Sequence, residues 1–275
     1  MKTAFISDLH VDVNQGQPVL EETAAAAKEQ GAEMIIVAGD LTETPVRSVG
    51  TARKLERMSG LPVFYVPGNH DLWNKNVPGT EIGDIYQMFR ADPRCLVEKV
   101  MLLDGKDGKF ALTGDIGWYD YSFAMDGCSR QELDSMTCGD RTWKDRLYNS
   151  WTDDNPGTLQ KRLDMLRNQL RVCRDYPVVV VTHMAPVREL LLSKGTKQWD
   201  FFQAFLGSSA YEDLFHQFNV KLSVSGHIHR RLTMEKEGIS YICPCLGHQR
   251  EWADYGLGDE SAAAQVRNAM QVVDL

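Results

Sequence analysis

Residues 33–40 read EMIIVAGD, a near-continuous apolar run over Glu33–Ala38 that is followed by Gly39 and Asp40. Such a run predicts a strand buried on both faces, as in a parallel sheet covered by helices. Residues 3–7 and 62–66 are apolar runs of the same kind, one before and one after it along the chain. The three runs therefore predict neighbouring strands of one sheet.

Helix signals occupy the two intervals between these strands. Pro18 to Gln30 is alanine-rich and is followed by Gly31, and Thr44-Pro45 has the pattern of a helix cap with a first-turn proline. Gly60 ends this second helix. Alternating strands and helices with short connections predict right-handed crossovers and an α/β fold with a parallel sheet.

The second half of the chain resumes the same alternation. Its expected elements are a helix over Pro156–Arg174, a strand over Pro177–Thr182, a helix over Ser209–Phe218, a strand over Val220–Ser225 and a hairpin of Leu232–Lys236 with Ile239–Cys243. Glu237-Gly238 is the expected hairpin turn. The leucines of the first helix recur at helical spacing, which indicates one buried face.

An aromatic-rich segment at about 117–155 interrupts the alternation. It carries Trp, Tyr and Phe residues among many Asp and Arg residues, with no repeat or low-complexity run. We interpret it as an insertion over one end of the sheet within a single domain of residues 1–275. Its aromatic side chains are expected in the core more often than stacked on a nucleobase or sugar. Trp118 and, outside the segment, Trp73 are the two to test first for such stacking.

Composition narrows the class of protein. The net charge of −8 disfavours nucleic acid as a partner, because such binding needs clustered Lys and Arg. No apolar stretch reaches the length of a membrane span, and the N-terminus lacks the pattern of a signal peptide. The six cysteines form no C-x-x-C pair, so reduced thiols and a cytoplasmic location are expected.

Five short polar motifs follow the predicted strands directly. They are Asp8-Leu9-His10, Gly39-Asp40, Gly68-Asn69-His70-Asp71, Thr182-His183 and Gly226-His227-Ile228-His229. The carboxyl ends of strands in an open α/β sheet form the edge where ligands bind, so these motifs are expected to converge. Five of the seven histidines lie in them, a placement that favours metal binding over scattered structural roles.

The types of side chain in these motifs indicate which cations they hold. The expected ligands are Asp8, His10, Asp40, Asn69, His183, His227 and His229. Carboxylates, imidazoles and one amide without thiolates suit divalent manganese, iron or zinc. Seven ligands are too many for one tetrahedral ion and fit two ions that share a carboxylate. The three glycines before ligands are expected to let the backbone bend sharply.

In this order the motifs resemble those of the calcineurin-like metallophosphoesterases, and they extend from position 8 to position 229. The resemblance implies a four-layer α/β/β/α sandwich of two mixed sheets. It also implies that Asp8, His10 and His229 hold one divalent metal ion, that Asn69, His183 and His227 hold the other, and that Asp40 bridges them. Trp73 and Gly117-Trp118-Tyr119-Asp120-Tyr121 are also similar to a bacterial branch of phosphoesterases with undefined substrates.

The expected activity is hydrolysis of a small-molecule phosphate ester, mono- or diester, by a hydroxide held between the metals. His70 is the motif histidine left without a metal, and we expect it to protonate the leaving oxygen, with Asp71 fixing its tautomer. His216 is expected to be structural, and a ligand role for His248 is not expected.

Several alternative functions remain open at this point. One is a cyclic-nucleotide phosphodiesterase, although Met184-Ala185 stands after His183 where many such relatives carry a histidine and a proline. Another is a non-catalytic metal-binding scaffold, which the full ligand set disfavours. Protein serine/threonine phosphatases fit less well, because Asp40 is followed by Leu-Thr-Glu-Thr. The oligomeric state stays open.

Overall fold

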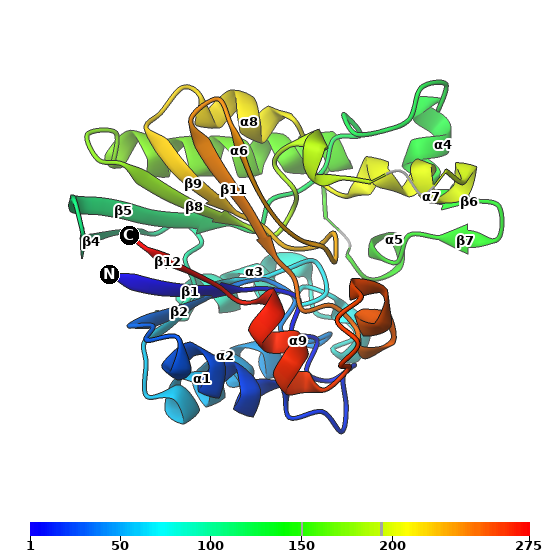
Figure 1. Cartoon of the computed structure of the whole chain (residues 1–275). Coiled ribbons are helices and arrows are strands. Elements are labelled where there is room, and N and C mark those ends of the chain that lie inside the picture. The colour runs from blue at the N-terminus through cyan, green and yellow to red at the C-terminus, as the bar shows by residue number, and fades with distance from the viewer. Residues whose placement is uncertain (150, 193–194) are drawn as a thin grey trace.

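Two sheets pack face to face between two layers of helices in the computed structural model, which describes residues 1–149, 151–192 and 195–275 (Figure 1). The smaller sheet has the strand order β12-β1-β2-β3. Its strands are β1 (Lys2–Ile6), β2 (Met34–Ala38), β3 (Val63–Val66) and β12 (Gln271–Asp274). β1, β2 and β3 run parallel, as the sequence predicts, and β12 joins β1 antiparallel.

The larger sheet has the order β10-β11-β9-β8-β5-β4. Its strands are β4 (Val100–Gly105), β5 (Gly108–Asp115), β8 (Val178–Thr182), β9 (Val220–Val224), β10 (Arg231–Lys236) and β11 (Ile239–Pro244). The four inner strands are parallel, and both edge strands belong to antiparallel hairpins. In the β10–β11 turn, Glu237 and Gly238 have φ of 49° and 79°, as a tight two-residue hairpin requires.

Helices cover the outer face of each sheet (Figure 1). Those against the smaller sheet are α1 (Val19–Glu29), α2 (Pro45–Ser59), α3 (Ile82–Ala91) and α9 (Ala262–Ala269), and those against the larger sheet are α6 (Asn155–Val172) and α8 (Ala210–Phe215). The predicted α/β/β/α sandwich of two mixed sheets is confirmed. Among the described residues, no helix has the length and apolarity needed to cross a membrane.

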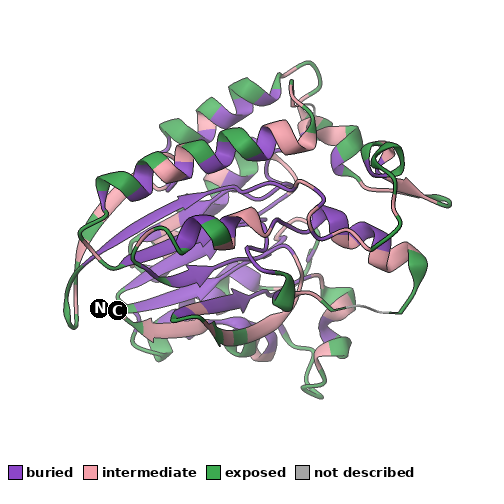
Figure 2. Ribbon diagram, turned by 90° about the horizontal axis from the view of Figure 1, so that it is seen from above, coloured by how far each residue is buried: buried purple, intermediate pink, exposed green. Residues whose placement is uncertain are grey.

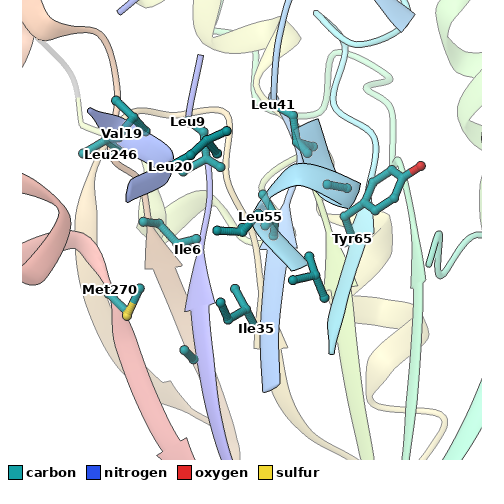
Figure 3. Close-up of a cluster of buried hydrophobic side chains, with 14 of the residues drawn as sticks. Ile6, Leu9, Val19, Leu20, Ile35, Leu41, Leu55, Tyr65, Leu246 and Met270 are labelled. Carbon is teal, nitrogen blue, oxygen red and sulfur yellow. The ribbon is translucent and has the colours of Figure 1, made fainter. Parts of the chain in front are cut away.

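Three apolar cores correspond to the three interfaces between the four layers. One lies between the smaller sheet and its helices, where Leu20, Ile35 and Leu55 meet (Figure 3). A second lies between the two sheets and includes Ile36 and Val181. The third joins the larger sheet to α6 and α8. Figure 2 shows the inner strands mostly buried, while edge strands are partly exposed and the helices present exposed faces to solvent.

The aromatic-rich segment forms short elements beside one end of the sandwich (Figure 1). They are α4 (Arg130–Ser135), β6 (Thr137–Cys138), β7 (Arg141–Thr142) and α5 (Asp145–Tyr148), and α7 (Lys197–Phe202) lies close to them. Residue 150 lies outside the described part. The segment shares the third core through Trp118, Phe123 and Met136, which favours the single-domain interpretation. That interpretation stays a prediction.

Short 3-10 helices lie in the connections: η1 (Asn74–Asn76), η2 (Arg188–Leu190), η3 (Gln203–Phe205) and η4 (Gln249–Tyr255). η4 follows β11 and lies beside the ends of the strands that carry the histidine motifs. The six cysteines form no disulfide. Cys243 and Cys245 share a face of the chain, with their Sγ atoms 3.4 Å apart.

Candidate metal centre

All seven predicted ligands come together beyond the carboxyl ends of five strands. Asp8 and His10 follow β1, Asp40 follows β2, Asn69 follows β3, His183 follows β8, and His227 and His229 follow β9. Every one except His229 is buried, and the His229 side chain is 19% exposed. The two facing sheets thus contribute opposite walls of one polar site in an otherwise apolar interior.

The first group of ligand atoms consists of Asp8, His10, Asp40 and His229. The Nε2 atoms of His10 and His229 are 3.2 Å apart. The His229 Nε2 atom lies 3.4 Å from Asp8 Oδ1, and the His10 Nε2 atom lies 3.5 Å from Asp40 Oδ2. These donors face a common point with no intervening residue, as the coordination shell of a cation does.

The second group consists of Asp40, His183 and His227, with Asn69 beside them. The His183 Nε2 atom lies 3.3 Å from Asp40 Oδ2 and 3.1 Å from Asn69 Oδ1. Asp40 belongs to both groups. A carboxylate at this place can contribute one oxygen to each of two neighbouring cations.

The arrangement of donors is difficult to stabilise without a cation. Asp40 Oδ2 is buried and has no hydrogen-bond partner. A buried carboxylate oxygen of this kind costs free energy unless it is paired or coordinates a metal. Two imidazole Nε2 atoms facing each other also leave at least one lone pair without a partner unless a proton or a cation lies between them. The residues therefore fit divalent cations.

Partners on the far side of three imidazoles indicate which ring nitrogen is free to bind metal. His183 Nδ1 lies 2.9 Å from the Ala38 carbonyl oxygen, and His229 Nδ1 lies 2.6 Å from Glu251 Oε2. His227 uses its other nitrogen, with Nε2 lying 3.2 Å from the Phe205 carbonyl oxygen. In the neutral ring, donation of one N–H to such an acceptor leaves the opposite nitrogen unprotonated toward the site, as in most metal-binding histidines.

The backbone at the ligands is strained. Asp8, His10, Asp40, His227 and His229 have positive φ of 56°, 41°, 55°, 70° and 47°. Non-glycine residues seldom adopt this conformation, and it costs of order 1–3 kcal/mol at each position. Such strain persists where the surrounding structure fixes the backbone, and it is concentrated at functional sites.

Close packing explains two of the three glycines in the motifs better than bending does. A Cβ atom at Gly68 would lie 2.1 Å from Asp40 Oδ1, and one at Gly226 would lie 2.7 Å from Asp8 Oδ2. Neither glycine has positive φ, whereas Gly39 has φ of 89° and would also crowd His183. The expectation of a sharp bend is correct for Gly39, and the other two leave room for the carboxylates.

Charge is distributed unevenly among the ligands. Burial lowers the pKa of His227 to about 3, which keeps that ring neutral. For His183, burial also opposes the charged form, but Asp40 outweighs it and raises the pKa to about 9. The pKa of Asp40 stays well below its ordinary value because neighbouring imidazoles outweigh the effect of its burial. Carboxylates here stay ionised, as cation binding requires.

His70 lies at the rim of the site, with its side chain 17% exposed. Its Nε2 atom is 3.9 Å from Asp40 Oδ2, and its Nδ1 atom is 3.6 Å from Glu43 Oε1. The ring stacks on Trp73 at a centroid distance of 3.8 Å and an interplanar angle of 26°. A ring held on one face beside the metal ligands is placed to exchange a proton with a bound substrate.

The expected pairing of Asp71 with His70 is wrong. The Asp71 carboxylate accepts hydrogen bonds from the backbone N–H groups of Leu41, Thr42 and Gly68 and from the Ser48 hydroxyl. These partners lie in the loop between β2 and α2, in α2 and in the loop after β3, and Glu43 faces His70 instead. Burial raises the pKa of Asp71 to about 6.

Three carboxylates at the site lie outside the five sequence motifs. Glu43 faces His70, Glu251 pairs with His229, and Asp145 accepts a hydrogen bond from Asn69. Each comes from a segment far from its partner in the chain, so only its acidic type could have drawn attention to it. The sequence does not indicate that His248 lies near the candidate ligands. Its ring centroid is 4.4 Å from that of His10 and 4.8 Å from that of His229.

His216 and two tryptophans have the structural roles expected from the sequence. His216, at the end of α8, pairs with Glu237 and lies outside the site. Trp73 and Trp118 are both 1% exposed, so neither presents a free face to a nucleobase or sugar.

The fold and the site define a class of protein, an α/β/β/α sandwich with candidate metal ligands clustered where strands of both sheets end. The sequence model of the calcineurin-like phosphoesterases matches residues 1–231. The chain belongs to this family and is a metal-dependent phosphoester hydrolase.

Two known proteins show how far the likeness extends. "[Acyl-carrier-protein] phosphodiesterase PptH" of Mycobacterium tuberculosis is 24% identical over 267 residues, which cover 90% of this chain and 78% of that protein. The crystal structure of the phosphopantetheinyl hydrolase PptH from the same organism has a TM-score of 0.76 at 21% identity and covers 99% of this chain and 95% of that one. The crystal structure of TT1561 of Thermus thermophilus has a TM-score of 0.52 at 15% identity, covering 99% and 98%.

Proposed function

We propose that this chain is a phosphodiester hydrolase that uses two divalent cations, with Asp40 shared between them. The observation that carries this proposal is the membership of Asp40 in both ligand groups, Asp8-His10-Asp40-His229 and Asp40-His183-His227. Manganese, iron and zinc all suit these ligands. When bound, the cations supply Lewis acidity toward the phosphoryl oxygens and a water made acidic enough to attack phosphorus near neutral pH.

The protein's own residues divide the remaining work. His10, His183, His227 and His229 hold the cations with the carboxylates of Asp8 and Asp40 and the amide oxygen of Asn69. His70 donates a proton from its ring to the leaving oxygen, while Trp73 and Glu43 hold the ring in place. Asp71 holds the loop that carries Asn69 and His70, through its bonds to the backbone.

The mycobacterial relative is named a phosphodiesterase, which supports a diester substrate. A second and narrower candidate is removal of a phosphopantetheinyl group from an acyl carrier protein. It is favoured by a structural likeness that covers 99% of this chain, and so includes the segment at about 117–155. Mass spectrometry of a carrier protein that bears this group, incubated with the enzyme and Mn²⁺, tests whether the group is released.

A substrate panel tests the broader proposal. The panel contains a chromogenic aryl phosphodiester, the matching monoester and a cyclic nucleotide, each with added Mn²⁺. We expect hydrolysis of the aryl diester that stops when a chelator is added and returns when Mn²⁺ is restored. Preference for the monoester would replace the diester assignment, and preference for the cyclic nucleotide would narrow it to cyclic diesters. A lack of turnover with Mn²⁺, Fe²⁺ or Zn²⁺ would favour the non-catalytic scaffold.

A further inference from the structure

The aromatic-rich segment at about 117–155 contributes a buried carboxylate to the metal centre. Asp145, the first residue of α5, is 1% exposed. Five side-chain donors surround it, which are Asn69 Nδ2 at 2.8 Å, Trp73 Nε1 at 2.7 Å, Trp143 Nε1 at 2.9 Å, Tyr119 Oη at 3.2 Å and Asn149 Nδ2 at 3.2 Å. None of these partners carries a charge, so the carboxylate is held by hydrogen bonds alone.

The donors come from two parts of the molecule. Asn69 and Trp73 belong to the loop that follows β3, while the other three belong to the aromatic-rich segment. Asp145 therefore joins the segment to the loop that carries a predicted metal ligand. Asn149 strengthens this joint, because its Nδ2 atom also donates to the backbone carbonyl of Asn69 at 3.2 Å.

The bond to Asp145 determines which way the Asn69 amide faces. An ionised carboxylate only accepts hydrogen bonds, so it must face the NH₂ group of Asn69. The amide oxygen then points the other way, and it lies 3.1 Å from His183 Nε2 among the second group of ligands. Since a cation needs the oxygen and not the NH₂ group, Asp145 selects the orientation in which Asn69 can bind metal.

The same carboxylate also holds Trp73. The indole N–H donates to the Oδ1 atom that accepts from Asn69, and the indole stacks on the His70 ring. One oxygen thus sets the position of a metal ligand and of the ring that supports the expected proton donor.

We propose that Asp145 is a positioning residue through which the aromatic-rich segment completes the second cation site. This inference rests on the proposed function, because it assumes that Asn69 binds one of two cations. A merely structural role would let Asp145 stabilise the segment without affecting how tightly the second cation binds.

Titration with Mn²⁺ alone tests the proposal on the full chain. The variants are Asp145→Ala, Asp145→Asn and the control Asp134→Ala, and circular dichroism checks that each is folded. Asp134 is a matched control because it also lies in the segment and accepts a hydrogen bond from a tyrosine, Tyr121, but it contacts no site residue in the part of the chain that the structure describes.

We expect Asp145→Ala to weaken the second Mn²⁺ by about 10–100-fold, as loss of a group that orients a metal ligand does, and to leave the first unchanged. Asp145→Asn should weaken it less, because one oxygen remains for five donors. Asp134→Ala should bind both ions as the unmodified protein does.

Two outcomes separate this proposal from the proposed function. If the unmodified protein binds fewer than two Mn²⁺ ions, the two-cation function fails and this inference fails with it. If the unmodified protein binds two and folded Asp145→Ala binds them equally well, only the inference is overturned. Should Asp145→Ala not fold, Asp145→Asn decides, and binding of both ions as in the unmodified protein overturns the inference.

Discussion

At the scale of single residues, the histidines of the centre differ in the group that contacts the ring nitrogen facing away from the site. His183, His227 and His229 each have an acceptor on the outer ring nitrogen, and His70 has a carboxylate at 3.6 Å and an indole against its face. The first three are thereby prepared to bind metal. His70 Nδ1 has no hydrogen-bond partner, so no acceptor holds this ring as one holds each of the other three.

His70→Ala tests this division of roles. The substitution removes the proposed proton donor and leaves all seven metal ligands, so turnover should fall by about 10²–10⁴-fold while the metal content stays constant. Steady-state kinetics and elemental analysis measure the two quantities. His216→Ala is the matched control, since it also removes a partly exposed histidine, and it should change neither. Full turnover by His70→Ala with a natural substrate would exclude this histidine from the reaction.

The positions of the candidate ligands could be predicted from the sequence, but the side chain that faces His70 could not. The convergence of the seven candidate ligands could be predicted because each lies shortly after a strand, and the strand determines where it lies. The partner of His70 could not be predicted. Asp71 is its neighbour in the chain, but its carboxylate turns inward to cap backbone N–H groups of the loop, while Glu43 reaches the ring from another segment.

At the scale of secondary structure, seven strands of the two sheets were predicted, whereas β4, β5 and β12 were not. β2 and β8 are buried on both faces, and their continuous apolar runs between turn residues indicate them. β4 and β12 are half-exposed edge strands with weaker patterns. Helix α8 ends at Phe215, before the predicted Phe218, because the residues after it form a turn that leads into β9.

Packing is tight where the strands lead into the loops that hold the candidate ligands. Gly68→Ala would place a Cβ atom 2.1 Å from Asp40 Oδ1, so Asp40 must move or the loop must shift. We expect weaker metal binding and a loss of about 1–3 kcal/mol in the free energy of unfolding, as for other overpacked sites.

Gly50→Ala is the matched control for this substitution. Gly50 lies within α2, and no atom lies within 4 Å of the position its Cβ would take. Alanine there should stabilise the helix by about 0.5–1 kcal/mol and leave metal binding unchanged. Denaturant unfolding and Mn²⁺ titration compare the two variants, and equal behaviour would show that the space at Gly68 is unimportant.

At the scale of the whole molecule, the metal centre lies where the two sheets meet. β1 and β2 from the smaller sheet and β8 and β9 from the larger one each end in ligands, and Asp40 lies against His183 across the interface. Cations bound here would hold the two halves of the sandwich together, so we expect metal binding and folding to be linked.

Metal removal should therefore lower the melting temperature. A cation present at about 100 times its dissociation constant stabilises the folded state by about 2.7 kcal/mol, which corresponds to about 5–10 °C for a chain of this size. Differential scanning calorimetry with Mn²⁺ and with excess chelator measures the difference. Identical melting temperatures would mean that the site holds no cation under those conditions.

The most direct test is a count of metal ions per chain by elemental analysis, for the unmodified protein and for Asp40→Ala, both loaded with Mn²⁺ and freed of excess. Since Asp40 contributes to both ligand groups, the unmodified protein should hold two ions and Asp40→Ala should lose at least one. Asp104→Ala, which removes an exposed carboxylate, should keep both. Two ions retained by Asp40→Ala would contradict the shared carboxylate on which the proposed two-cation centre depends.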